Sequence, residues 1–533
     1  CRQAVLQAKT TADKESAAKA MLINGAIQWT RGWYHEAAVA FDAVARDYPK
    51  SEVAPDALWR AINCYMELNE TDKLLMFKRF IEERSKQLVR DYPTDSHVGD
   101  LQLIDGQQLD RAGKSLEAAA VYEKISSDSV RYLDARFYAA SSYLRHARKL
   151  ENGSQPKDAE PFAAKAQNGF LSVLKDTESA KLTVADPKVK ARIEQVEFNA
   201  RLALANLYLS GTAAKPAEAE NILKPIKLSD DDKQAPKLWA LRIRIKVESG
   251  KIEEATAEMQ AALDKAPESR DLVATCRSLA STLDSRAVER AKTDRIGAND
   301  LWKQATQYYL RSSTGASKEE IAQIAERLRV IGLIANEVGE KVEGWFELPD
   351  FKAKDMVAWQ GALDLYRRLA DNDAMTWKTR VGRASILGYL GKWDECEAEL
   401  SKLFEENNIL GANQRLDSEA LKKKPELLNA FLEWGIALRM PTATGEEKVR
   451  RARASERLHR VLQTVPPDSK QWWFARYVQI QTLFDRGLYD DADVSLSSLE
   501  RTNQDFDGDR FQLKLRFKKL KTDIALKVPP KKK

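Results

Sequence analysis

Residues 24–54, NGAIQWTRGWYHEAAVAFDAVARDYPKSEVA, predict two helices joined by a tight turn. Ala37 and Phe41 lie four residues apart, a spacing that places them on one face of the second helix. Gly32 suits the turn, because a residue without a Cβ adopts positive φ at little cost. Pro49 ends the second helix, since proline has no N–H to donate. One such hairpin leaves its apolar faces uncovered and needs a similar hairpin beside it.

The same spacing recurs four more times along the chain. In each copy an Ala or Cys lies five residues after the turn glycine, and a large apolar residue lies four residues further on. The residues that define this register are Gly32, Ala37, Phe41 and Pro49; Gly113, Ala118 and Tyr122; Gly250, Ala255, Met259 and Pro267; Gly391, Cys396 and Leu400; and Gly487, Ala492 and Leu496. A hairpin repeated in this way predicts a stacked helical array.

This register resembles the tetratricopeptide repeat (TPR), in which W-x2-L-G-x2-Y is followed by A-x3-F and a proline over about 34 residues. The best match runs from Trp239 through Gly250, Ala255 and Met259 to Pro267. The resemblance implies an all-α fold, a TPR-like α-solenoid wound as a right-handed superhelix with its first helices on the concave face. The helix pattern predicts about eleven hairpins and a C-terminal capping helix. The resemblance says little about function, because one fold serves many tasks.

An irregular aromatic loop interrupts the helical pattern and is a candidate joint between two halves. We expect an N-terminal TPR-like array over residues 1–338, the joint over residues 339–352, a C-terminal array with its capping helix over residues 353–526, and a disordered basic tail over residues 527–533. At 533 residues the chain is too long for one compact core, but a repeat array escapes this limit because each unit contacts only its neighbours.

The composition suits helices with one buried face and one wet face. Charged residues make up 31% of the chain, and 86 basic side chains balance 80 acidic ones to a net charge of +6. The four histidines lie in separate hairpins, and the common phosphate-loop, dinucleotide, zinc-protease and nucleophile-elbow motifs are missing. No apolar run approaches the roughly 18 residues of a membrane span. We therefore expect no catalytic residue, cofactor, metal or transmembrane span, and no nucleic-acid partner.

Our preferred hypothesis is a non-enzymatic scaffold for protein–protein interaction that binds a peptide or a partner helix in its concave groove. The candidate partner-binding residues are Trp29, Lys237 and Arg244 on predicted first helices, and Trp345 and Phe346 in the aromatic loop. Further tryptophans on predicted first helices are Trp59, Trp239, Trp377, Trp434 and Trp473, most of which we expect in the core. The alternative hypothesis is a helical-repeat regulatory or substrate-recruiting region of a larger enzyme.

The segment Tyr48-Pro49-Lys50-Ser51 is similar to the repeat joints of bacterial cell-envelope proteins. These proteins include the outer-membrane assembly lipoprotein family and the periplasmic cell-division coordinator family. The resemblance makes Cys1 a candidate for lipidation, which would anchor the chain at a membrane surface. The expected location is then the cell envelope, facing the periplasm, if Cys1 carries lipid, and the cytoplasm if it does not.

If this resemblance reflects the location, native protein from its source will carry a lipid on Cys1 and partition into the membrane fraction. Mass spectrometry of the N-terminal peptide measures the modification. A Cys1 that is unmodified and continuous with upstream sequence would remove the envelope assignment and leave the scaffold hypothesis in place.

Overall fold

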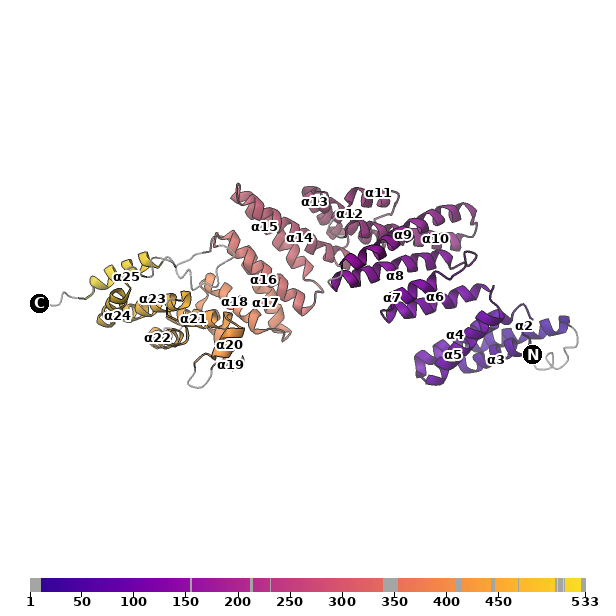
Figure 1. The fold of residues 1–533 in the computed structure, drawn as a ribbon, viewed down its shortest axis with the longest axis horizontal. Helices are drawn as coiled ribbons and strands as arrows, with labels where there is room; N and C mark the ends of the chain where they lie inside the picture. The colour runs from indigo at the N-terminus through magenta and orange to yellow at the C-terminus, as the bar shows by residue number, and fades with distance from the viewer. Residues whose placement is uncertain are drawn as a thin grey trace. The chain divides into compact units, whose positions relative to one another are not determined.

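The computed structural model describes residues 11–153, 156–210, 214–230, 232–338, 353–407, 410, 415–441, 446–467, 469–503, 506, 511 and 513–528. These residues form 24 helices, and the only extended pairing among them is an isolated bridge between Leu410 and Leu416 (Figure 1). The expected all-α fold is therefore confirmed. The chain divides into two compact units, Cys1–Ser249 and Gly250–Lys533.

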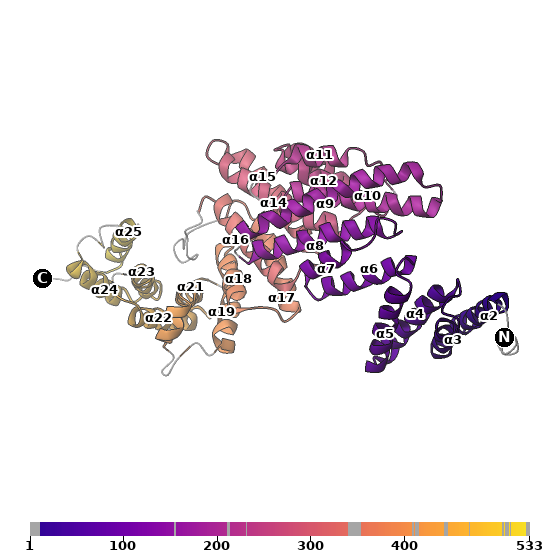
Figure 2. The ribbon, with the colours of Figure 1, turned by 45° about the vertical axis from the view of Figure 1, so that its right-hand side comes forward.

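The first unit is a stack of five helical hairpins followed by one more helix. Its described helices are α2 (Thr11–Thr30), α3 (Tyr34–Asp47), α4 (Ala54–Asp72), α5 (Leu75–Asp91), α6 (Ser96–Arg111), α7 (Ser115–Tyr122), α8 (Tyr132–Asn152), α9 (Pro156–Thr183), α10 (Pro187–Tyr208), α11 (Pro216–Leu223) and α12 (Ala235–Glu248). Helices α6 to α10 lie side by side in both ribbon views (Figures 1 and 2). The first helix of each hairpin contacts the first helix of the next, from α2 to α12, so these helices form one continuous face.

The second unit has the same construction. Its described helices are α13 (Ile252–Lys265), α14 (Arg270–Arg290), α15 (Arg295–Ser312), α16 (Lys318–Ala335), α17 (Val357–Asp371), α18 (Trp377–Tyr389), α19 (Trp393–Asn407), α20 (Ser418–Lys423), α21 (Glu426–Arg439), α22 (Glu447–Thr464), α23 (Lys470–Asp485), α24 (Tyr489–Thr502) and α25 (Lys514–Ala525). First helices α16, α18, α21, α23 and α25 contact one another in succession. Leaving out the short α20, the described helices of the second unit that follow α13 form five successive pairs, from α14 with α15 to α23 with α24, and α25 is a final single helix. Both units therefore have the hairpin arrangement of a TPR-like α-solenoid.

The five turn glycines of the sequence register all adopt the left-handed conformation. Their φ angles lie between 69° at Gly391 and 78° at Gly32. A Cβ added at Gly32 or Gly113 would meet nothing within 4 Å. These turns therefore require the backbone freedom of glycine and not its small size.

Side chains of the second helices fill the space between the two helices of a hairpin. The small residues Ala37, Ala118, Ala255, Cys396 and Ala492 are fully buried, and the large residues Phe41, Tyr122, Met259, Leu400 and Leu496 are at most 2% exposed. In the first unit the large ring lies against a glycine of the first helix. A Cβ at Gly25 would come within 2.5 Å of the Phe41 ring, and a Cβ at Gly106 within 2.3 Å of the Tyr122 ring. The first and second helices can approach this closely only because both positions are glycine.

The tyrosine–proline joints of the first unit have one shared geometry. Tyr48 caps α3 at φ −131° and ψ 55°, and Tyr92 caps α5 at φ −135° and ψ 57°. In each joint, the backbone N–H of the residue three positions after the tyrosine donates a 3.0 Å hydrogen bond to the tyrosine carbonyl oxygen. The donors are Ser51 in the first joint and Asp95 in the second. The Tyr92 hydroxyl also donates to the Pro49 carbonyl oxygen at 2.8 Å. These joints therefore connect successive hairpins, which is a structural role.

The helices on either side of residues 339–352 form one hairpin. Helix α16 packs along α17, and the Trp359 indole N–H donates to the Arg329 carbonyl oxygen at 3.0 Å. The Asn336 side chain accepts hydrogen bonds from the backbone N–H groups of Lys354 and Asp355 at 2.7 and 2.9 Å. Residues 339–352 themselves lie outside the described residues, and the division of the chain at that point remains a prediction.

Replacing Gly25 by alanine should destabilise the protein by about 1–3 kcal/mol, because the new Cβ overlaps the buried Phe41 ring. The denaturation midpoint followed by circular dichroism measures the effect. A smaller side chain at position 41 removes the overlap, so Gly25→Ala with Phe41→Leu should cost less than the sum of the single substitutions. Additive costs would show that the close approach of Gly25 and Phe41 does not limit the packing.

Candidate functional site

The described candidate residues lie on first helices but do not form one site. Trp29 is half-buried on α2, whereas Lys237 and Arg244 lie on α12 at the other end of the first unit. Lys237 is exposed and Arg244 is half-buried, with its Nη1 donating to Asn206 Oδ1 at 2.6 Å. Desolvation lowers the pKa of Arg244. Cys1, Trp345 and Phe346 lie outside the described residues.

First helices of the first unit enclose a hollow of about 470 Å³, which we call the Trp29 hollow. Trp29 comes from α2, Trp59, Arg60 and Glu67 come from α4, and His97 comes from α6. Three successive hairpins therefore contribute to one concave space. Its lining of indole rings with charges of both signs is suited to contact with a peptide.

His97, which lines the Trp29 hollow, lies close to two carboxylates. Its ring stacks on Trp59 at a centroid distance of 5.1 Å. Its Nδ1 lies 3.4 Å from Asp100 Oδ2, and its Nε2 lies 3.8 Å from Asp56 Oδ1. The hydrogen bond with Asp100 and the charges of Asp95 and Asp56 raise the pKa of His97, although burial opposes the charged form. Because Asp56 belongs to α4 and His97 to α6, a protonated imidazole links two first helices.

First helices of the second unit enclose a larger hollow of about 660 Å³, which we call the Trp377 hollow. Arg329 comes from α16, Trp377 and Val381 come from α18, and Asn429 and Glu433 come from α21. Two of the other tryptophans noted in the sequence, Trp434 and Trp473, are 7% and 1% exposed and belong to the core.

Trp377 lines this hollow, and two cations lie near its ring. The Nζ atoms of Lys378 and Lys424 lie 5.6 and 5.1 Å from the centroid of the half-buried indole ring. A partner that stacks on this ring would meet both ammonium groups as well. This part of the hollow therefore offers an aromatic surface next to positive charge.

Hydrogen-bonded charged side chains line the Trp377 hollow. Arg329 donates twice to Glu326, with Nε–Oε2 and Nη2–Oε1 distances of 2.9 and 2.7 Å. Burial would lower the pKa of Arg329, but Glu326 outweighs it and raises the pKa. The Ser385 hydroxyl donates to both carboxylate oxygens of Glu433, which is 1% exposed. These contacts hold polar groups in fixed positions, as a recognition surface requires.

Within the described residues, no group of three or more His, Cys, Asp or Glu side chains could hold a metal ion. None of the described helices is both long and apolar enough to cross a membrane. The described cysteines Cys64, Cys276 and Cys396 are fully buried. Burial raises the pKa of Cys64 to about 12 and that of Cys276 to about 11, so both remain thiols at neutral pH.

Sequence reasoning did not identify the polar members of either hollow. His97 follows Asp95, which caps α6, and it is half-buried, so its place between two carboxylates depends on how α4 and α6 pack. Glu433 lies in an apolar stretch of α21. An acidic residue among apolar neighbours was the signal for it in the sequence, because a buried charge needs a polar partner. That signal marks a buried polar contact but does not identify its partner, Ser385.

No family model matches the chain, and no curated protein matches it. Among solved structures, the chain is similar to the crystal structure of yeast Tom70, with 12% identity, coverage of 96% of each chain and a TM-score of 0.17. It is also similar to a chain of the APC/C hetero-tetramer Cut9-Hcn1, with 12% identity, coverage of 98% of this chain and 93% of that chain, and a TM-score of 0.27. Both TM-scores are too low for these matches to carry an argument about function.

The raised pKa of His97 predicts a pH-dependent link between α4 and α6. The folded-state pKa exceeds the value of about 6.5 for an unfolded chain. The stabilisation is therefore complete below about pH 6.5 and is lost as the pH rises through the folded-state pKa. NMR titration of the four histidines, with His97→Gln to assign the resonance, measures the pKa. A His97 pKa at or below about 6.5 would contradict this account.

Proposed function

We propose that this chain is a non-enzymatic scaffold for protein–protein interaction, and that its first helices bind a peptide or a partner helix. The Trp377 hollow is the observation that carries the proposal. Three successive first helices, α16, α18 and α21, contribute side chains to one concave space, together with Tyr366 from α17. A surface built from several repeats suits an extended ligand, because each repeat adds one more set of contacts along it.

The chemistry of the hollow supports a peptide as the ligand. Trp377 supplies a large rigid contact surface at low entropic cost. Lys378 and Lys424 beside the ring suit an acidic or carbonyl-rich segment, while Val381 adds an apolar contact. Interface energy concentrates in a few aromatic and arginine anchors of this kind. Trp377 is therefore the residue we expect to contribute most to binding.

The Trp29 hollow gives the first unit a surface of the same type. Trp29 and Trp59 form its aromatic part, and Glu67 is its exposed acid. We assign partner binding to Trp29 in this hollow and to Lys237 and Arg244 on the α12 surface. The cell-envelope location remains a prediction, and it rests on the sequence of the tyrosine–proline joints and on Cys1.

Peptides selected from a random library against the full chain should include a class whose affinity depends on Trp377. For this class we expect Trp377→Ala to cost about 2 kcal/mol, because the substitution removes the aromatic anchor. Isothermal titration calorimetry measures the affinity, and circular dichroism checks that the variant is folded.

Trp33→Ala is the matched control. Trp33 is 51% exposed and lies at the start of α3, outside the residues that line either hollow. It should leave the affinities of these peptides unchanged. If every selected peptide binds Trp377→Ala and Glu67→Lys as tightly as the unaltered protein, neither hollow is a binding site and the proposal is wrong.

A further inference from the structure

The outward side of α2 carries an apolar stripe. Helices α2 and α3 lie at the end of the stack that α2 to α5 form (Figure 2). Leu22 of α2 packs against the core cluster around Phe41. On the opposite side of the helix, Ile23 and Ile27 are 59% and 45% exposed. Ala20 precedes them at a three-residue step, so the three side chains lie on one face. We call these three residues the α2 stripe.

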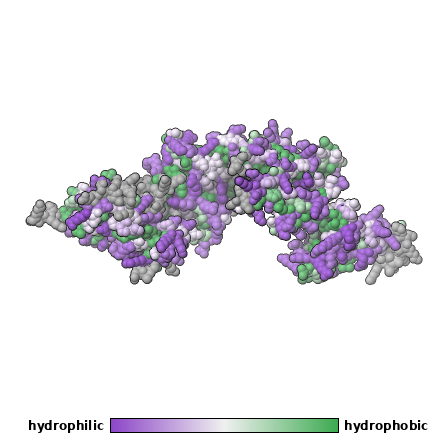
Figure 3. All heavy atoms as spheres, in the orientation of Figure 1, coloured by the Kyte–Doolittle hydropathy of each residue, from purple (hydrophilic) through white to green (hydrophobic). Residues whose placement is uncertain are grey.

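The α2 stripe differs from the rest of the surface around it. Figure 3 shows mostly hydrophilic residues over the N-terminal helices in that view. The stripe lies in a stretch without charge, since no ionisable residue occurs from Ala20 to Thr30. A helix that ends an array in solvent normally has a polar outer face. The α2 stripe instead has the character of a contact surface between hairpins.

The repeat register identifies the same positions in other hairpins. Ala20, Ile23 and Ile27 lie 12, 9 and 5 residues before the turn glycine Gly32. The residues at these distances before the other four turn glycines are Leu101, Ile104 and Gln108; Leu238, Leu241 and Ile245; Thr379, Gly382 and Ile386; and Ala475, Val478 and Thr482. All of them are buried or half-buried except Gln108, which lines the space between α5 and α6. These positions are therefore covered in the inner hairpins.

Helix α12 shows what covers them. Leu238, Leu241 and Ile245 share one core cluster with Ala219 and Leu223 of α11, the second helix of the preceding hairpin. The eight residues of α11 measure about 12 Å at 1.5 Å per residue. The seven steps from the first to the last position of the register measure about 10 Å. One short helix is therefore long enough to cover the whole stripe.

The preceding second helix covers this register in other hairpins as well. Leu101 of α6 packs in one cluster with Leu88 of α5. A Cβ at Gly382 of α18 would lie 2.4 Å from the hydroxyl oxygen of Tyr366 on α17. Val478 of α23 is fully buried, and α23 packs against α22. The fold therefore defines what fits the α2 stripe, which is the second helix of a hairpin.

The second helices that the structure describes already have this contact. Each of them contacts the first helix that follows it, from α3 with α4 to α24 with α25. A second copy of this chain therefore has none among them to offer to α2 in the same arrangement. The face that fits the stripe is uncharged, because a charge buried against Ile23 and Ile27 would have no partner.

We propose that the α2 stripe binds one helix of a partner protein in the way that α12 contacts α11. The partner helix carries a small and an aliphatic residue four positions apart on an uncharged face, as α11 carries Ala219 and Leu223. It adds one more layer to the array, since each layer contacts only its neighbours. The residues of the α2 stripe line neither hollow, so this proposal is independent of the proposed function.

The test uses the chain's own α11 as the probe. A fluorescent peptide with the sequence of residues 214–228 is titrated against the full chain. Its side chains at Ala217 and Asn221, which are exposed in α11, are replaced by a covalent link that holds the peptide helical. Fluorescence anisotropy should show saturable binding. The linked peptide with Leu223→Glu should bind about tenfold more weakly, because a carboxylate would then be buried against the uncharged stripe.

Ile27→Glu in the full chain should weaken binding of the linked peptide about tenfold for the same reason. Val39→Glu is the matched control, since Val39 is 57% exposed on α3 of the same hairpin and lies outside the stripe. It should leave the affinity unchanged. Trp377→Ala should also have no effect on this peptide, which separates the α2 stripe from the proposed function of the Trp377 hollow.

Four results would overturn the proposal. The first two are no saturable binding of the linked peptide and an equal loss of affinity with Ile27→Glu and Val39→Glu. The third is self-association of the unaltered chain that Ile27→Glu abolishes, which would identify a second copy as the occupant. The fourth is binding that appears only after residues 1–10 are removed, which would identify that segment as the occupant. Light scattering measures self-association, and circular dichroism confirms that each variant is folded.

Discussion

Contact between a large side chain of one helix and a glycine of the other determines how closely the two helices of a hairpin approach each other. The Phe41 ring lies on Gly25, and in the second unit the Trp359 indole lies on Gly332, where a Cβ would come within 2.2 Å of the ring nitrogen. The contact buries a whole ring and draws two helix backbones together. Other apolar side chains, such as Leu88 and Leu101, pack between hairpins, so each hairpin requires a neighbour and the array continues.

A half-buried aspartate in the first unit and a buried one in the second each tie three successive helices together. Asp42 of α3 accepts from the Tyr65 hydroxyl of α4 and from Arg84 Nε of α5, each at 2.8 Å. Asp284 of α14 accepts from Trp302 Nε1 of α15 at 3.2 Å and from Arg327 Nε of α16 at 2.6 Å. A buried carboxylate is costly unless it is paired and hydrogen-bonded, so each aspartate requires all its partners in place. Such contacts resist slippage of one hairpin along the next.

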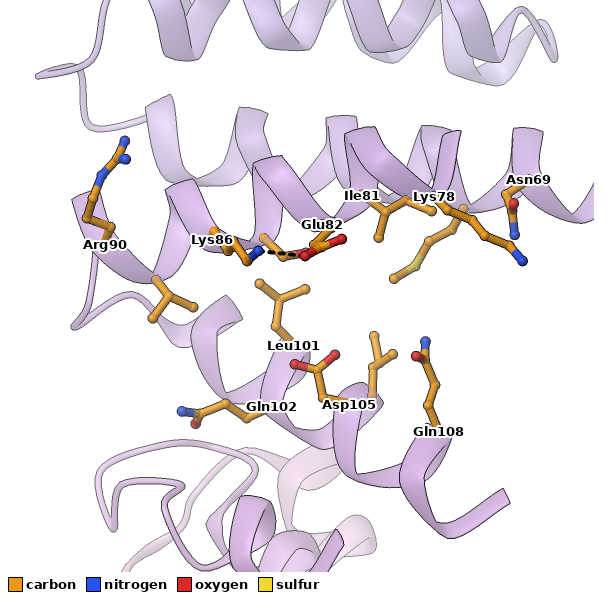
Figure 4. Close-up of a pocket in the computed structure, with 14 residues that line it drawn as sticks. Asn69, Lys78, Ile81, Glu82, Lys86, Arg90, Leu101, Gln102, Asp105 and Gln108 are labelled. Atoms are coloured by element: carbon orange, nitrogen blue, oxygen red, sulfur yellow. Dashed lines mark hydrogen bonds and ion pairs between the residues drawn. The ribbon is translucent and has the colours of Figure 1, made fainter. Parts of the chain in front are cut away.

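The candidate binding surfaces lie where packing between hairpins is less complete. The two hollows lie along first helices, where side chains of three consecutive hairpins surround a concave space. A cleft between α5 and α6, drawn in Figure 4, forms where these two helices share only one end of their interface. In each place polar groups are held by neighbours, as Glu433 is held by Ser385. Ordered polar groups beside exposed rings or aliphatic strips are what selective protein binding requires.

The sequence by itself determined the all-α fold and the order of the hairpins. The repeat register lies within one hairpin: a turn glycine, a small residue five positions later and a large apolar residue four positions after that. Its spacing is therefore visible in a short stretch of sequence. The positions and linings of the two hollows and of the cleft depend on the tertiary structure, because each is lined by residues of several helices. Trp29 and His97 are 68 residues apart in the sequence yet line one hollow. The divergence of α5 from α6 depends on the side-chain volumes packed between Leu88 and Leu101, and no local pattern specifies how such volumes fit together.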